Sequence, residues 1–241
     1  MMTMSAHKRI RIEHDEFPES PRVWDNLGTM VCWHRLYSLG DEQPSEDPQE
    51  YMLALAEEFS PGITERVEAE CERLTGKAGR VDLLTDEQRH ELWRDIDAVC
   101  DRHLDRHLYP NIIVMPLYLY DHSGITMNTG GFSCPWDSGQ VGFIFVRISD
   151  VKKEFGWRVL TAKRREQVLD YLRNEVEVYD QYLRGDVWGF TVEEYTPDEG
   201  WQETDSCWGF YGSDPFENGM SDHINEDDHV LLRIASDKLH D

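Results

Sequence analysis

The stretch 121–138 holds the residue types that nucleophilic catalysis requires. His122 follows Asp121, and Cys134 and Asp137 lie further along the same stretch. A thiol nucleophile needs a base that takes its proton and an acid that orients that base. The sequence therefore predicts a candidate hydrolase-like site, with Cys134 as the thiol, His122 as the base and Asp121 or Asp137 as the orienting acid. A version of this site assisted by a metal ion belongs to the same hypothesis.

The same stretch also has the composition of a rigid turn. Asp121 and Ser123 are residue types that hydrogen-bond the local backbone, and Gly124 and Gly130 tolerate positive φ. On this alternative, the thiol and the imidazole are near one another in sequence without any catalytic role.

A second candidate site consists of carboxylates on two predicted helices. The first set is Glu65, Glu68 and Glu72, and the second is Asp97, Asp101 and Asp105. DNA carries one negative charge per about 1.7 Å of helix axis, so a row of carboxylates can occupy a groove built for DNA. We expect these six residues to bind a cationic partner, as a nucleic-acid mimic does.

Metal and cofactor motifs are weak. His103 and His107 are spaced to share one helix face, but Leu104 stands where a zinc protease has glutamate. The acidic tail from Asp214 has Phe216 at a position where a calcium-binding loop has an oxygen ligand. We therefore predict no metal site and no cofactor.

Helices are predicted from apolar periodicity and from breaker residues. The segments are 49–59, 64–75, 85–108 and 161–184. Thr85 and Gln88 have the spacing of a capping box at the start of the third. Residues 230–235 are expected to add a last strand or a short helix.

Strands are predicted where β-branched and aromatic residues cluster. The strongest are 112–120 and 140–148, joined by the loop 121–138. Two further runs, 187–195 and 201–211, flank a turn signal and predict an antiparallel hairpin.

Together these elements predict an α+β fold, with a central antiparallel or mixed sheet covered by several helices and a helical N-terminal part. We expect a flexible arm over 1–20 and a single domain over 21–241, because the central strands need helices to cover them. A helical lobe 21–109 with a β-rich lobe 110–241 is the alternative division.

Composition narrows the class of partner. The chain has 241 residues and a formal net charge of −24, from 48 acidic and 24 basic residues. Such a charge repels nucleic acid and attracts basic proteins. Five widely spaced cysteines fit a reducing cytoplasm, and no apolar stretch is long enough to span a membrane. Residues 1–16 lack the apolar segment of a secretory signal.

Parts of the C-terminal half resemble a family of uncharacterised proteins of bacteriophages and related mobile elements. The resemblance rests on residues 116–124 (PLYLYDHSG), 132–142 (FSCPWDSGQVG), 179–186 (YDQYLRGD) and 205–212 (DSCWGFYG). It implies an origin in a phage or mobile element and action in the cytoplasm of a bacterial host.

Charge and resemblance together lead to a functional hypothesis. We expect an accessory protein that binds and inhibits a basic host or defence protein, one that itself binds nucleic acid, through an acidic surface. The alternative is the small Cys/His-dependent enzyme described above.

Overall fold

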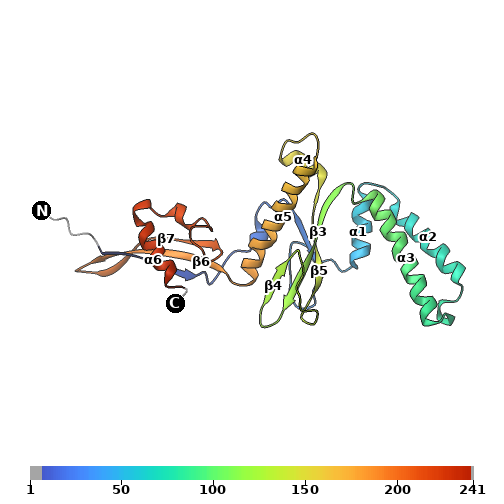
Figure 1. The fold of residues 1–241 in the computed structure, drawn as a ribbon, viewed down its shortest axis with the longest axis horizontal. Helices are drawn as coiled ribbons and strands as arrows, with labels where there is room; N and C mark the ends of the chain where they lie inside the picture. The colour runs from blue at the N-terminus through green and yellow to red at the C-terminus, as the bar shows by residue number, and fades with distance from the viewer. Residues whose placement is uncertain (1–6, 240–241) are drawn as a thin grey trace. The chain divides into compact units, whose positions relative to one another are not determined.

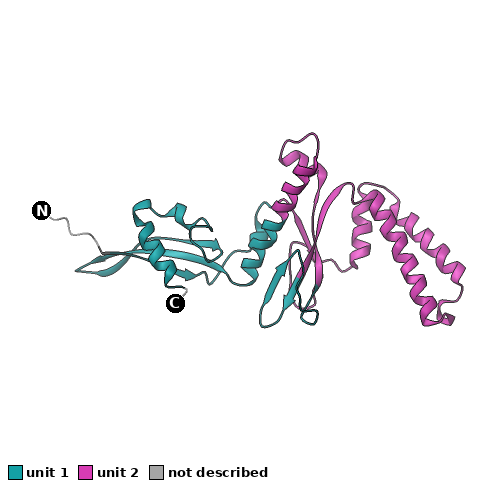
Figure 2. Ribbon diagram, in the orientation of Figure 1, with its two compact units in different colours: residues 1–26, 119–139, 173–241 teal, residues 27–118, 140–172 magenta. Residues whose placement is uncertain are grey.

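The computed structural model describes residues 7–239, and the chain divides into two compact units (Figure 1 and Figure 2). Unit 1 comprises residues 1–26, 119–139 and 173–241, and unit 2 comprises 27–118 and 140–172. Each unit is built from segments far apart in sequence. Residue 109, where the sequence suggested a division into lobes, lies inside unit 2.

The chain has the α+β fold predicted from its sequence. The strands are β1 (His7–His14), β2 (Thr29–Cys32), β3 (Ile112–Asp121), β4 (Ile125–Asn128), β5 (Ser138–Arg147), β6 (Val187–Thr196) and β7 (Gly200–Tyr211). The helices are α1 (Pro48–Glu57), α2 (Ile63–Ala78), α3 (Asp86–His107), α4 (Ile148–Glu154), α5 (Ala162–Leu183) and α6 (His229–Asp237). None of the helices within residues 7–239 is both long and apolar enough to cross a lipid bilayer.

Unit 1 contains an antiparallel sheet of three strands in the order β1-β6-β7. The hairpin of β6 and β7 confirms the prediction. The expectation of a flexible arm over 1–20 is wrong for residues 7–14, which form β1 and pair with β6 along its whole length, and residues 1–6 of that arm lie outside the described residues. Ile10 and Ile12 alternate with charged residues, so one face of β1 is apolar and is buried on the unit's core.

Helix α6 covers the apolar face of this sheet, which resolves the choice between strand and helix for residues 230–235. Leu232 and Ala235 of α6 pack in one buried cluster with Ile10, Phe190 and Phe210 of the three strands. The opposite face of the sheet lies outside this cluster and carries Glu193 of β6 and Trp201, Glu203 and Trp208 of β7.

The second sheet has four strands in the order β2-β5-β3-β4. β3 and β5 are the two strong strands predicted from sequence, and β2 pairs antiparallel with β5. Gly142 of β5 lies opposite Cys32, where a Cβ would come within 1.9 Å of the Val31 carbonyl oxygen. Only glycine allows so close an approach of the two backbones.

Besides β1, the strand β4 and the helix α4 were absent from the sequence prediction. The segment 121–138, expected to be a loop, contains the short strand β4, and α4 follows β5 directly. Both are short, and short elements carry too few residues for periodicity to reveal them.

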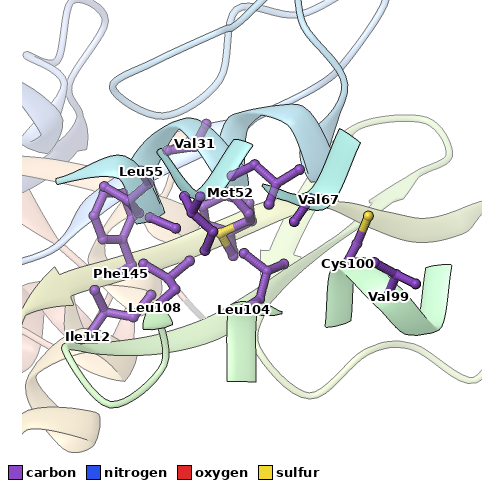
Figure 3. Close-up of a cluster of buried hydrophobic side chains, with 14 residues drawn as sticks. Val31, Met52, Leu55, Val67, Val99, Cys100, Leu104, Leu108, Ile112 and Phe145 are labelled. Carbon is purple, nitrogen blue, oxygen red and sulfur yellow. The ribbon is translucent and has the colours of Figure 1, made fainter. Parts of the chain in front are cut away.

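The helices α1, α2 and α3 of unit 2 share an apolar core with β2, β3 and β5 (Figure 3). Figure 3 shows Leu104, Leu108 and Phe145 within this cluster. The predicted capping box is present, with the Thr85 hydroxyl accepting from the Gln88 N–H and the Gln88 side chain accepting from the Thr85 N–H.

Candidate functional site

The candidate catalytic residues all belong to unit 1, on the segment between β3 and β5. The Asp121 N–H donates to the Asp137 carbonyl at 2.8 Å, which closes this segment at its base. The His122 N–H donates to the Gly124 carbonyl, and Ser123 has a φ of 60°. Backbone hydrogen bonds within the segment therefore hold residues 121–124 in a tight turn, as the rigid-turn interpretation predicts.

Asp137 lies between the other two candidate groups. The Cys134 thiol donates to Asp137 Oδ2 at 3.6 Å, and His122 Nδ1 lies 3.7 Å from the same oxygen. The Ser138 hydroxyl donates to the Cys134 carbonyl. The structure thus brings Cys134, His122 and Asp137 together, and Asp121 joins them through its backbone.

The order of these groups does not match that of a nucleophilic triad. In a triad the imidazole contacts the nucleophile and the carboxylate orients the imidazole. Here the carboxylate, and not the imidazole, contacts the thiol. The His122 side chain is 63% exposed, so solvent surrounds the base. Within the described residues, Asp137 contacts both the Cys134 thiol and the His122 imidazole, and no hydrogen bond joins the imidazole to the thiol.

The six predicted binding carboxylates lie on α2 and α3, and all six are exposed. Basic residues alternate with them. Residues 63–107 carry twelve acidic and eight basic residues, so their charge per residue is close to the average of the chain. These helices do not concentrate negative charge.

Ion pairing removes part of the charge that α2 carries. Glu70 contacts His103 Nε2 at 3.2 Å and Arg102 at 2.7 Å, and Arg73 lies 3.3 Å away. The hydrogen bond from His103, together with that from Arg102, holds the pKa of Glu70 below its usual range. Glu70 therefore links α2 to α3.

Glu68 and Glu72 line an open groove of about 730 Å³ between α2 and α3. Trp93, which is 51% exposed, and Ile96 form its apolar part. The groove combines two carboxylates with an aromatic ring, which is a suitable arrangement for a single Lys or Arg side chain.

The helical histidines engage other groups. The rings of His103 and His107 stack with centroids 6.0 Å apart, and His103 is paired with Glu70. Burial lowers the pKa of His107, with a further contribution from Arg66. Within residues 7–239 the structure has no group of three His, Cys, Asp or Glu side chains arranged to hold a metal ion.

The longest stretch of the chain without Lys or Arg belongs to unit 1, on and after the β6–β7 hairpin. Residues 185–232 contain thirteen acidic residues and no Lys or Arg. A running charge count along the sequence would have found this stretch. The total charge and the helix pattern, on which the sequence prediction relied, did not.

Cations from β1 neutralise only some of these carboxylates. Arg9 Nε donates to Glu193 Oε2 at 2.7 Å, Arg11 Nε lies 3.2 Å from the same oxygen, and Lys8 pairs with Asp228. The hydrogen bond from Arg9 holds the pKa of Glu193 below its ordinary value. These pairs fasten β1 to the unit.

Five carboxylates of the hairpin have no such partner. In the described part of the chain, no Lys, Arg or His nitrogen lies within 4.0 Å of them. They are Glu194, Asp198, Glu199, Glu203 and Asp205. We call this set the hairpin carboxylates.

Aromatic rings lie on the same hairpin. Trp201 stacks edge-on against Tyr195 with centroids 5.5 Å apart, and the Arg9 guanidinium sits 4.1 Å above the Trp201 ring. Trp208 pairs across the strands with Gly189, where a Cβ would lie 2.1 Å from the indole. Trp201 and Trp208 are 37% and 45% exposed.

Comparison with known proteins adds no further assignment. No protein-family model, curated protein or solved structure matches this chain.

Proposed function

We propose that this protein binds a basic partner protein through the β6–β7 hairpin. The observation that carries the proposal is the set of five hairpin carboxylates, which have no cation partner among residues 7–239 and belong to a stretch of 48 residues that lacks Lys and Arg. Unpaired like charges repel one another, and a cationic partner relieves that repulsion.

The aromatic residues of the hairpin support a cationic ligand. The position of Arg9 over Trp201 is an internal example of a guanidinium held by this surface. Trp208 presents a second exposed indole, with Glu203 and Ser206 between the two on the same face of β7. An Arg side chain from a partner can contact a ring and a carboxylate here together.

β7 is the last strand of its sheet, so its outer edge suits an extended segment. An extended peptide that pairs with such an edge gains main-chain hydrogen bonds, and its alternate side chains gain the specific contacts. The occupant we propose is an extended Lys- and Arg-rich segment of the partner, lying along Gly200–Tyr211.

The resemblance to phage and mobile-element proteins suggests the kind of partner. We propose a host or defence protein that binds nucleic acid, whose cationic surface meets carboxylates in place of phosphates. Binding would inhibit that protein by covering the surface with which it holds nucleic acid.

The test measures the binding of a fluorescent peptide in which Arg alternates with Thr. A variant carrying Asp198→Asn, Glu199→Gln, Glu203→Gln and Asp205→Asn loses four charges and should bind at least about tenfold more weakly. The matched control, Glu65→Gln, Asp97→Asn, Asp101→Asn and Asp105→Asn, loses the same charge from α2 and α3 without touching the groove lined by Glu68 and Glu72, and should retain most of the affinity. Affinity of the wild type should fall as salt rises.

Two results contradict the proposal. Equal loss in both variants would mean that only net charge attracts the peptide. Unchanged peptide binding, with new self-association of the hairpin variant in sedimentation, would mean that these carboxylates only protect an edge strand from pairing.

A further inference from the structure

In the segment 147–165 of unit 2, basic residues outnumber acidic ones, which is the opposite of the balance in the whole chain. It carries seven basic and two acidic residues, in a protein where acidic residues outnumber basic ones two to one. The basic residues are Arg147, Lys152, Lys153, Arg158, Lys163, Arg164 and Arg165. The segment runs from the end of β5 through α4 into the first turn of α5.

Three of these cations line one cavity. It has a volume of about 450 Å³, and Lys152, Arg158 and Arg165 form its charged part. Ile148, Val159 and Leu160 are among its apolar walls. All of the lining residues belong to unit 2.

The three cations have no partner within the described residues. No carboxylate oxygen lies within 4.0 Å of the charged nitrogens of Lys152, Arg158 or Arg165. Cations that converge on one cavity repel one another unless an anion is bound between them. In a chain with this excess of carboxylates, leaving three cations together without an ion pair costs stability.

The loop that carries Arg158 is held in place by other residues. Trp157 stacks on Phe155 with centroids 4.6 Å apart, and the Arg164 guanidinium lies 4.8 Å above the Trp157 ring. Arg164 Nη1 also donates to the Val159 carbonyl at 2.7 Å. Arg164 therefore holds the backbone of the loop that lines the cavity, which reduces the ordering that ligand binding requires.

We propose that this cavity binds a small phosphorylated molecule. Guanidinium groups match the oxygens of a phosphate, and the start of α5 at Ala162 adds N–H groups of the same polarity. The cavity is larger than a phosphate requires, and its apolar walls are suited to the organic part of a phosphate ester. The site is separate from the hairpin carboxylates and does not depend on the function proposed for them.

The experiment uses calorimetry on the full chain with phenyl phosphate, inorganic phosphate and phenol as probes. We expect phenyl phosphate to bind more tightly than inorganic phosphate, and phenol to bind not at all. The double variant Arg158→Gln and Arg165→Gln should lose about tenfold or more in affinity for phenyl phosphate. Thermal unfolding of each variant shows whether it remains folded.

The matched control removes two charges from the same segment without touching the cavity wall. Lys153→Gln with Lys163→Gln should bind phenyl phosphate within about twofold of the wild type. Equal losses in the two double variants would overturn the proposal, because general attraction to a basic segment would explain both. So would binding of a short oligonucleotide with no binding of either small phosphate, which would make the segment a nucleic-acid contact.

Discussion

Residues 185–232 and 147–165 are the stretches in which charge departs furthest from the average of the chain, in opposite directions. The first has thirteen acidic residues without Lys or Arg, and the second has seven basic residues against two acidic ones. In each, part of the charge is paired and part is not. Glu193 and Arg147 are paired with Arg9 and Glu58, whereas Glu203 and Arg158 have no ion pair within the described residues.

The comparison separates two uses of charge. Paired groups join segments distant in sequence, since Arg9 lies on β1 and Glu58 follows α1. The unpaired groups have no counter-charge within the described residues to offset their mutual repulsion, and a ligand of opposite charge would relieve it. We expect the removal of a paired charge to lower stability and the removal of an unpaired charge to leave it almost unchanged. The following experiments test this distinction.

The largest effect on stability is expected for Glu193→Gln. The carboxylate is mostly buried, accepts a hydrogen bond from Arg9 and forms an ion pair with Arg11, so its loss should lower the free energy of unfolding by about 2 kcal/mol. Chemical denaturation measures this. The matched variant Glu203→Gln, on the facing position of β7, should change stability by less than about 0.5 kcal/mol.

The pH dependence of the same variant follows from the lowered pKa of Glu193. A carboxyl whose folded-state pKa is depressed stabilises the fold fully above its ordinary value of 4.5, and loses that contribution as the pH falls through the folded-state pKa. The stability difference between wild type and Glu193→Gln should therefore be greatest at neutral pH and shrink below pH 4.5. A difference that stays constant with pH would show that packing, not charge, is responsible.

A smaller effect is expected for Arg147→Gln in the basic segment. Arg147 makes two 2.7 Å hydrogen bonds to Glu58, and that contact holds the pKa of Glu58 below its usual range. Because both side chains are partly exposed, the loss should be only about 0.5–1 kcal/mol in denaturation. Arg158→Gln should cost nothing or should stabilise slightly, since it removes an unpaired cation. If Arg158→Gln lost as much stability as Arg147→Gln, that result would contradict the distinction between paired and unpaired charges.

The smallest effect concerns quenching of tryptophan fluorescence by ions. Trp208 belongs to the acidic stretch 185–232, and Trp157 belongs to the basic segment 147–165 and lies beneath the Arg164 guanidinium. Caesium should therefore quench the acidic region preferentially, and iodide the basic one. Trp208→Phe should reduce the fraction of emission quenched by caesium, and Trp157→Phe the fraction quenched by iodide. The same response to both ions in both variants would show that the local fields are alike.

Local pattern was sufficient for much of the fold. Thr85 and Gln88 predicted the start of α3 correctly, because a capping box involves only residues three apart. The β6–β7 hairpin was likewise predicted from a turn between two apolar runs. β1 was missed, because its partner strand lies about 180 residues away and its short alternation of isoleucine with charge is a weak signal alone.

The sequence by itself determined which charges exist, their total and the stretches in which one sign dominates. Only the tertiary structure decided which of them meet a counter-charge, because ion pairs such as Arg9 with Glu193 join distant segments. The same is true of the candidate catalytic residues. Their closeness followed from a short loop, but the position of Asp137 between Cys134 and His122 depends on how the strands that bound the loop are registered. Which charges form ion pairs, and how the candidate catalytic groups are arranged, depend on distances in space. The spacing of residues along the sequence does not determine these distances.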